Sequence, residues 1–199
     1  MFVQVVQGKV RDAEGLMAAV EEWDRELAPG ATGWLGTTAG VAEDGTFIAV
    51  VRFDSASSAR RNSDRPEQSD WWARTAGNLA GDVAFHDCDE VLKFQDGGSD
   101  DAGFVQVIQG RGDYGALRKM AGSPSEELRK YRPDVLGGTI ALHGDGGFTQ
   151  VVYFTSEAAA REGERKEPPS EVQEEMGAAL DPQGLTFIDL RDPMLRSPR

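Results

Sequence analysis

The stretch Phe2-Val3-Gln4-Val5-Val6-Gln7-Gly8-Lys9 occurs twice in the chain, the second time as Phe104-Val105-Gln106-Val107-Ile108-Gln109-Gly110-Arg111. Six of the eight positions are identical and the other two differ conservatively. The match continues at an offset of 101 residues, where 12 of the 26 positions in 35–60 equal their counterparts in 136–161. Self-similarity of this kind indicates an internal duplication. The sequence therefore predicts two tandem repeats, residues 1–95 and 103–192, with a glycine-rich linker over 96–102 and a tail over 193–199.

Both repeats carry the same succession of local patterns. Apolar β-branched runs ending at glycine predict strands, apolar residues at helical spacing predict helices, and Asp-Gly between two apolar runs predicts a hairpin. The elements expected in the first repeat are a strand, a helix, two strands, two helices and a strand, over residues 2–8, 12–27, 33–41, 46–53, 56–61, 67–79 and 83–93. In the second repeat, the last helix and strand are expected over 170–180 and 185–190.

The element order β-α-β-β-α-β is the split βαβ, or ferredoxin-like, arrangement, in which both helices cover one face of an antiparallel sheet. The first strand is apolar on both of its faces, so the other face of the sheet needs a cover as well. The other repeat is already tethered and can supply that cover. We therefore expect an α+β protein whose two ferredoxin-like repeats pack their antiparallel sheets face to face as an intrachain α/β barrel.

Composition excludes several classes of function. The chain has 199 residues, with 21 Lys+Arg against 34 Asp+Glu, and a net charge of -13. This charge disfavours binding to nucleic acid or to anionic membranes. The single cysteine, Cys88, cannot form an internal disulfide, and residues 1–6 carry no basic lead that would indicate a signal peptide. We expect a cytoplasmic protein that is a monomer with an internal pseudo-dimer, or a dimer of such chains.

Three segments of the first repeat resemble the antibiotic biosynthesis monooxygenase-like domains of the dimeric α/β barrel superfamily. They are Pro29-Gly30, Asp44-Gly45-Thr46 in the expected hairpin, and the run over residues 50–55 that leads into a helix. In that family two chains usually pair, and here the two repeats would supply both halves. The resemblance implies one of three things: a cofactor-independent oxygenase of polyketide quinones, a haem-degrading enzyme, or a domain without assigned activity.

All four tryptophans, Trp23, Trp34, Trp71 and Trp72, lie in the first repeat. In the alignment of the two repeats, Trp71 and Trp72 correspond to Val172 and Gln173. An aromatic ligand pocket would therefore exist in the first repeat only. Adjacent residues on a helix point about 100° apart, so Trp71 and Trp72 cannot both face one core. The four rings are the candidate substrate pocket, and the alternative is that they only fill the core.

The resemblance to cofactor-free oxygenases implies polar groups that stabilise a substrate anion in a dry site. The candidate catalytic residues are Asn62, Trp72 and Arg52, with His86 as a possible general base. Each has a structural alternative. Asn62 lies in a segment with good turn chemistry, Arg52 could be a solvated strand residue, and His86 could be a hydrogen-bonded structural histidine.

A metal or haem site has little support in the sequence. His86, Asp87, Cys88 and Asp89 alternate between the two faces of a strand, which is poor geometry for a metal. Cys88 itself is expected to be a buried thiol. The haem-degrading relatives use a histidine on the second helix, and neither repeat has one there. We therefore expect no metal and no cofactor.

The favoured function is the binding of a small apolar or aromatic molecule in the first repeat, without turnover. The first alternative is cofactor-independent monooxygenation of an aromatic or polyketide-type substrate. Haem binding or degradation is the further alternative. An enclosed cavity under the helix over 67–79, with Asn62, Trp72 or Arg52 pointing inward, would favour chemistry, and a solid apolar core would favour a binding module.

Overall fold

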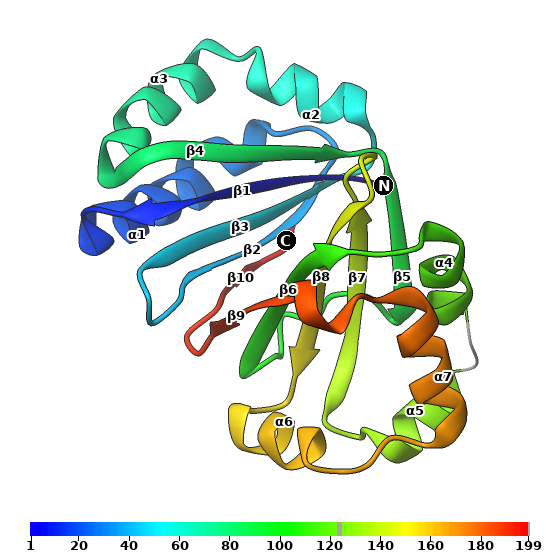
Figure 1. Ribbon diagram of the computed structural model, residues 1–199. Coiled ribbons are helices and arrows are strands. Elements are labelled where there is room, and N and C mark those ends of the chain that lie inside the picture. The colour runs from blue at the N-terminus through cyan, green and yellow to red at the C-terminus, as the bar shows by residue number, and fades with distance from the viewer. Residues whose placement is uncertain (123–124, 199) are drawn as a thin grey trace. The chain divides into compact units, whose positions relative to one another are not determined.

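The computed structural model describes residues 1–122 and 125–198, and the chain divides into two compact units. The first unit consists of residues 1–89 together with the C-terminal residues from 194, and the second of residues 90–193. Each unit has one five-stranded antiparallel sheet and its own helices (Figure 1). The predicted α+β class, with two ferredoxin-like halves, is confirmed.

The first sheet has the strand order β10-β2-β3-β1-β4. Its strands are β1 (Phe2–Val10), β2 (Trp34–Val41), β3 (Thr46–Phe53), β4 (Leu79–Cys88) and β10 (Met194–Arg196). The predicted Asp-Gly hairpin joins β2 and β3, and Gly45 takes a φ of 77°, which glycine adopts without steric cost. β1 lies between β3 and β4 and pairs antiparallel with both.

Local capping explains where the helices of the first unit begin. α1 (Ala13–Glu22) starts after Asp12, whose side chain accepts a hydrogen bond from the backbone N–H of Gly15. It continues through a π-helical turn over Trp23–Leu27 and a 3-10 turn over Ala28–Gly30. Ser55 caps α2 (Ala56–Ser63) in the same way, and α3 (Pro66–Thr75) begins with a proline, which suits the first helical position.

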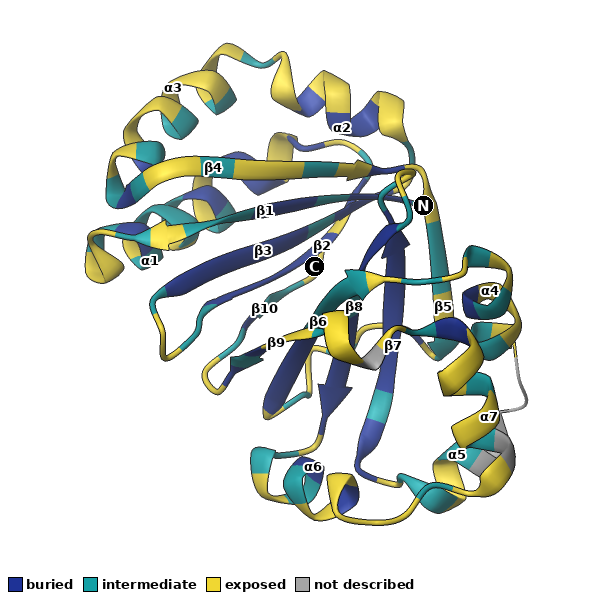
Figure 2. Ribbon diagram, in the orientation of Figure 1, coloured by how far each residue is buried: buried dark blue, intermediate teal, exposed yellow. Residues whose placement is uncertain are grey.

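The core of the first unit lies between these helices and one face of the sheet. One cluster of buried residues gathers around Trp23, Trp34 and Phe53, and a second around Leu16 and Phe47. Figure 2 shows the contrast along the sheet, where β3 is buried and β4 is mostly exposed. The two clusters hold α1, α2 and α3 on the sheet and so fix the walls of the space between them.

The second unit repeats this plan with the strand order β5-β7-β8-β6-β9. Its strands are β5 (Glu90–Gln95), β6 (Phe104–Arg111), β7 (Val135–Leu142), β8 (Gly147–Phe154) and β9 (Thr186–Leu190). Its helices are α4 (Tyr114–Gly122), α5 (Ser125–Tyr131), α6 (Glu157–Glu164) and α7 (Ser170–Ala179). Leu117 is fully buried in its core, as its counterpart Leu16 is in the first unit.

The fifth strand of each sheet comes from outside the repeat to which it is added. β5 follows β4 with only Asp89 between them, yet β4 pairs with β1 and β5 pairs with β7. The single strand predicted over 83–93 is therefore wrong, because this stretch forms two strands in two sheets. At the other end of the chain, β10 lies within the segment expected as a tail and pairs with β2. Arg199, the last residue of that segment, lies outside the described residues.

Side chains on both faces of β1 are buried, as the apolar pattern requires. Val3 and Val5 are fully buried on one face, and Phe2 and Val6 are nearly so on the other. The face-to-face closure of the two sheets stays a prediction.

Candidate functional site

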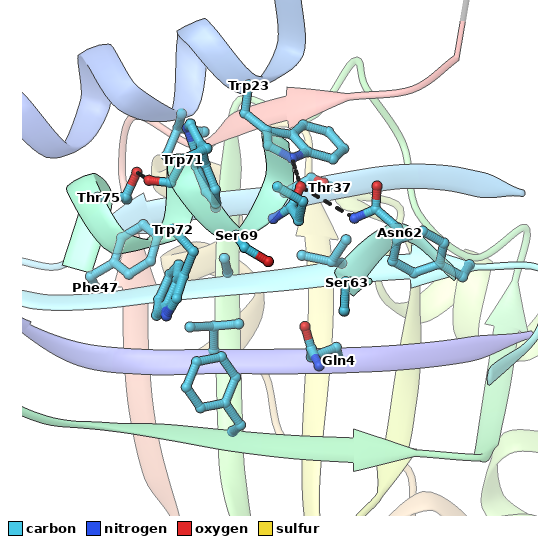
Figure 3. Close-up of a pocket in the computed structure, with 18 residues that line it drawn as sticks. Gln4, Trp23, Thr37, Phe47, Asn62, Ser63, Ser69, Trp71, Trp72 and Thr75 are labelled. Carbon is cyan, nitrogen blue, oxygen red and sulfur yellow. Dashed lines mark hydrogen bonds between the residues drawn. The ribbon is translucent and has the colours of Figure 1, made fainter. Parts of the chain in front are cut away.

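A cavity of about 350 Å³ lies in the first unit, between α2 and α3 and the face of the sheet (Figure 3). Its volume falls in the range typical of small-molecule sites. Mainly apolar side chains from β1, β2 and β3 form its floor, and aromatic, amide, hydroxyl and aliphatic side chains, from the helices, β4 and Gln4 on β1, form the rest. The floor residues are Val6, Thr37, Ala39, Phe47, Ala49, Val51 and Phe53.

Three tryptophans and one phenylalanine form a connected aromatic wall. The ring centroids of Trp23 and Trp71 are 6.5 Å apart, and those of Trp71 and Trp72 are 6.0 Å apart. Trp72 meets Phe85 edge to face at 5.4 Å. Phe85 is 47% exposed, so the wall reaches the surface at this point. Rings at these separations make a rigid face against which a flat aromatic ligand can pack.

A short hydrogen-bonded chain of amides lies beside this wall. The Oε1 atom of Gln68 accepts from Trp23 Nε1 at 2.6 Å and from Asn62 Nδ2 at 3.3 Å, as the dashed lines of Figure 3 show. The Oδ1 atom of Asn62 accepts in turn from Arg65 Nη1 at 3.0 Å, and this guanidinium also donates to the carbonyl oxygen of Leu27. Asn62 is only 8% exposed. The chain therefore fixes the Asn62 amide at the cavity wall, since a buried amide needs partners on both its oxygen and its nitrogen.

The indole N–H groups of the tryptophans differ in what they bind. Trp71 donates to the carbonyl oxygen of Ala19 at 2.8 Å, and Trp34 donates to Thr37 Oγ1 at 3.1 Å. In the described residues no acceptor is found for Trp72 Nε1, although Trp72 lines the cavity and extends from α3 toward the strands (Figure 3). This N–H is a donor that a bound molecule can use.

The cavity has no ionisable side chain in its lining. The lining residues in the described part of the chain are aliphatic or aromatic side chains, hydroxyls, and the amides of Gln4, Asn62 and Gln68. A charged ligand would lose its hydration without gaining a counter-ion, which is costly. The arrangement suits a neutral, flat molecule with one or two hydrogen-bonding oxygens.

The structure brings together some of the predicted site residues and separates others. Asn62, Trp23, Trp71 and Trp72 line the cavity. Trp34 is buried beneath Trp23, at a ring distance of 5.2 Å, and belongs to the core behind the wall.

The other two predicted catalytic residues, Arg52 and His86, lie on the opposite face of the sheet from the cavity. Val51 and Phe53 line the cavity, so Arg52 between them points the other way, where its Nη1 donates to Thr38 Oγ1 at 2.9 Å. Phe85 lines the cavity too, and His86 follows it on β4 beside the fully buried Val5. Alternation along a strand accounts for both placements.

Most of the lining residues were not among those predicted, and Gln68 and Phe85 are the two of them that bear most on the site. Gln68 precedes Trp71 and Trp72 by three and four residues, which places all three side chains on neighbouring positions of one helix face. That spacing is a signal in the sequence. Phe85 has no comparable local signal, because its position depends on the pairing of β4 with β1.

The donor set of the cavity does not fit haem or a metal ion. Haem iron in proteins takes an axial ligand from histidine, cysteine, methionine or tyrosine, and the lining of this cavity offers none of them. Across residues 1–122 and 125–198, no group of three or more His, Cys, Asp or Glu side chains is arranged to hold a metal ion. The same described residues contain no helix that is both long and apolar enough to span a membrane.

Comparison with known proteins finds similarity of fold alone. No family model and no curated protein matches the sequence. A provisionally assigned monooxygenase from Lactobacillus acidophilus superposes with a TM-score of 0.74 at 12% identity, covering 98% of this chain and 95% of that one. An anthrone oxidase-like protein gives a TM-score of 0.68 at 11% identity over 98% and 92% of the two chains. The heme-degrading enzyme LmHde from Listeria monocytogenes gives 0.50 at 11% identity over the full length of both.

The chain has the fold of these monooxygenase-like proteins, with two ferredoxin-like halves. This is the fold that the resemblance of its Pro-Gly and Asp-Gly segments implied. At 11–12% identity the likeness does not carry an activity from any of these proteins to this chain.

Proposed function

We propose that the first repeat binds a small, uncharged, flat aromatic molecule in the cavity under α2 and α3. The observation that carries the proposal is the composition of the lining, with three indoles and Phe85 beside the amides of Asn62 and Gln68 and no ionisable side chain. The aromatic wall offers apolar surface and rings on which the ligand can stack. Hydrogen bonds to the amides and to the Trp72 N–H would fix the orientation of the ligand.

Tryptophan fluorescence tests this binding directly, because every tryptophan is in the first repeat and three of the four line the cavity. Titration with anthrone, a neutral tricyclic ketone, is expected to quench or shift the emission with saturation at one molecule per chain. Anthracene-9-carboxylate, of similar size but charged, is the matched control and is expected to bind at least tenfold more weakly. Equal binding of the two, or no saturable change with anthrone, would contradict the proposal.

A second candidate function is cofactor-independent oxygenation of the bound molecule, favoured by the unpartnered N–H of Trp72. Deprotonation of an anthrone gives an enolate, and a donor aimed at its oxygen in a dry site stabilises that charge. The fold likeness to an anthrone oxidase-like protein gives the substrate class to test. The balanced reaction consumes one anthrone and one O₂ and yields anthraquinone and water. The methylene carbon loses two hydrogens, one oxygen atom becomes the new carbonyl, and the other leaves as water.

The pH dependence of the oxygenation rate distinguishes two mechanisms. In one, hydrogen-bond donors stabilise the substrate enolate, and in the other, a base of the protein removes the proton. Because no ionisable side chain lines the cavity, the rate is expected to rise with pH along the ionisation of the substrate, without an inflection from a protein group. Oxygen uptake with anthrone, corrected for its spontaneous oxidation without protein, measures this. Binding of anthrone without faster oxygen uptake would leave the first repeat as a binding module and reject the oxygenase.

A further inference from the structure

The second unit has a cavity of its own, between its sheet and its helices, with a volume of about 700 Å³. It is twice as large as the cavity of the first unit and lies within the range of small-molecule sites. We propose that it is a second ligand site, which takes an uncharged, mainly aliphatic molecule carrying a carbonyl oxygen. This inference does not depend on the function proposed for the first repeat.

Most of the apolar part of the lining is aliphatic, three phenylalanines (Phe94, Phe154 and Phe187) complete it, and the tryptophans of the first repeat have no equivalent here. It includes Ile108, Met120, Ile140, Val172, Met176 and Leu180, from β6, α4, β7 and α7 and the residue that follows α7. Methionine side chains are flexible and adapt to ligands of irregular shape. The aliphatic side chains of the lining outnumber its three phenylalanines, so the surface suits a bent alkyl chain better than a flat ring system.

One polar group in this cavity lacks a partner. Gln95 lines the cavity at the end of β5, and its Nε2 atom is enclosed and finds no hydrogen-bond partner in the described structure. Its backbone has a φ of 51°, a left-handed conformation that residues other than glycine seldom adopt. An enclosed amide nitrogen without an acceptor is uncommon in native proteins. A carbonyl oxygen on the ligand would accept a hydrogen bond from this nitrogen.

The charged side chains of the lining all have ion-pair partners: Arg161, Glu164 and Asp189 find theirs within the lining, and Arg132 and Glu175 pair with Asp134 and Lys119 outside it. Arg161 donates to Glu164 Oε1 at 3.0 Å and also to Asp189, and Gln106 Nε2 donates to Asp189 Oδ1 at 3.0 Å. Burial alone would lower the pKa of Arg161, but the hydrogen bonds to Glu164 and Asp189 outweigh it and raise that pKa. A charged ligand would find no uncompensated counter-ion here, and an uncharged one keeps the pairs intact.

In the second unit the guanidinium of Arg132 lies where the Asn62 amide of the first unit would have its counterpart. Asn62 corresponds to Gly163, and a side chain at Gly163 would collide with the guanidinium of Arg132. Arg132 is held by Asp134 at 2.7 Å and lies over the ring of Phe154, 5.6 Å from its centroid. The second cavity therefore does not reproduce the amide and indole donors of the first site, and a different ligand class is expected.

Isothermal calorimetry with methyl nonyl ketone, a neutral aliphatic ketone, tests the proposal. We expect one molecule bound per chain with no change in tryptophan emission, since all the tryptophans lie in the first repeat. Decanoate and decylamine, its charged counterparts, are expected to bind at least tenfold more weakly. In Gln95→Asn the new residue tolerates the left-handed backbone, but its side chain is shorter. The variant is expected to bind the ketone about fivefold more weakly, which corresponds to the loss of one hydrogen bond.

Variants of α7 locate the ligand. Val172→Trp places in the second cavity the ring that Trp71 provides in the first, and it is expected to abolish ketone binding. Gln173→Trp adds the same ring at the neighbouring exposed position and is expected to leave binding unchanged. If Val172→Trp fails to fold by circular dichroism, Met176→Trp, at a lining residue that is 43% exposed, replaces it.

Four results would overturn the proposal. They are no heat with the ketone up to its solubility limit, undiminished binding in the folded cavity-filling variant, a change in tryptophan emission on binding, and equal affinity for decanoate or decylamine. None of these outcomes bears on anthrone binding in the first repeat, so the two proposals fail separately.

Discussion

The two repeats keep the same frame and differ in what their helices present to the sheet. In each repeat a glutamine on the strand next to the sheet edge donates to an aspartate on that edge strand, Gln4 to Asp87 and Gln106 to Asp189. The cavity of the first repeat is lined by indoles and an asparagine amide, and that of the second by mainly aliphatic side chains, three phenylalanines and two arginines held by carboxylates. After duplication, the strands that define the fold changed little, while the side chains that line the two cavities diverged.

The largest expected effect is on the free energy of unfolding. It tests whether corresponding core residues of the two repeats contribute equally to stability and whether the repeats unfold together. Leu16→Ala and Leu117→Ala remove corresponding, fully buried side chains, and each is expected to cost about 2–5 kcal/mol of unfolding free energy. Because β5 and β10 carry each repeat into the sheet of the other unit, we expect Leu117→Ala also to shift the unfolding midpoint reported by tryptophan. Urea unfolding followed by tryptophan emission and by circular dichroism measures this. An unchanged tryptophan midpoint in Leu117→Ala would show that the repeats unfold independently.

The next effect concerns the oxygenation proposed as the second candidate function of the first repeat. Trp72→Phe keeps an aromatic ring and removes the unpartnered N–H, so it is expected to lower the rate of anthrone oxygenation about a hundredfold with little change in affinity. Trp71→Phe is the matched control, because its N–H binds the carbonyl oxygen of Ala19 and not the ligand space. Loss of that bond is expected to lower stability and leave the rate nearly unchanged. A similar fall in rate in both variants would argue against a role for the Trp72 N–H.

A third prediction concerns β10, the strand near the C-terminus that forms the edge of the first sheet beside β2. Met194 on β10 is 7% exposed, and Met194→Ala is expected to cost about 2 kcal/mol in unfolding free energy. Leu195→Ala, at the half-buried neighbouring position, is expected to cost clearly less. The same urea titrations give both values. Equal and negligible losses would mean that β10 contributes nothing to the stability of the first sheet.

The smallest effect distinguishes the two hairpins. Hydrogen bonds from Lys9 and then Thr46 lower the pKa of Asp44 from its ordinary value of 3.8 to about 2. A folded pKa below the unfolded one stabilises the protein above about pH 4, and this stabilisation is lost as the pH falls toward 2. Asp44→Asn is therefore expected to lose stability at pH 7, by no more than about 1 kcal/mol because the pair is exposed.

The second hairpin provides the control for that measurement. The pKa of Asp145 is lowered mainly by the backbone N–H of Gly147, and Arg111, the counterpart of Lys9, donates to the backbone carbonyl of Asp145. Asp145→Asn is therefore expected to show a weaker dependence on salt than Asp44→Asn. A loss of stability in Asp44→Asn that persists unchanged at pH 2 would contradict the assigned cause.

Local patterns in the sequence were enough to predict the frame, because strands, caps and Asp-Gly turns depend on neighbouring residues. Asn62 and Trp72 became candidates through the family resemblance, and the structure places both side chains in the lining of one cavity because α2 and α3 follow each other over the same sheet face. The break at Asp89 and the pairing of β10 with β2 could not be predicted, because they depend on strands far apart in the sequence. The alternation of Arg52 with Val51 and Phe53 was visible, but which face carries the cavity was not. The second cavity had no signal, because an unfilled volume depends on how all its walls pack.

One measurement tests the central claim that the two repeats hold different ligand sites. Methyl nonyl ketone is titrated by calorimetry into protein already saturated with anthrone, and tryptophan emission is recorded in parallel. The account predicts an unchanged ketone affinity, one molecule of each ligand per chain, and an emission change caused by anthrone alone. Mutual competition between the two ligands would contradict it.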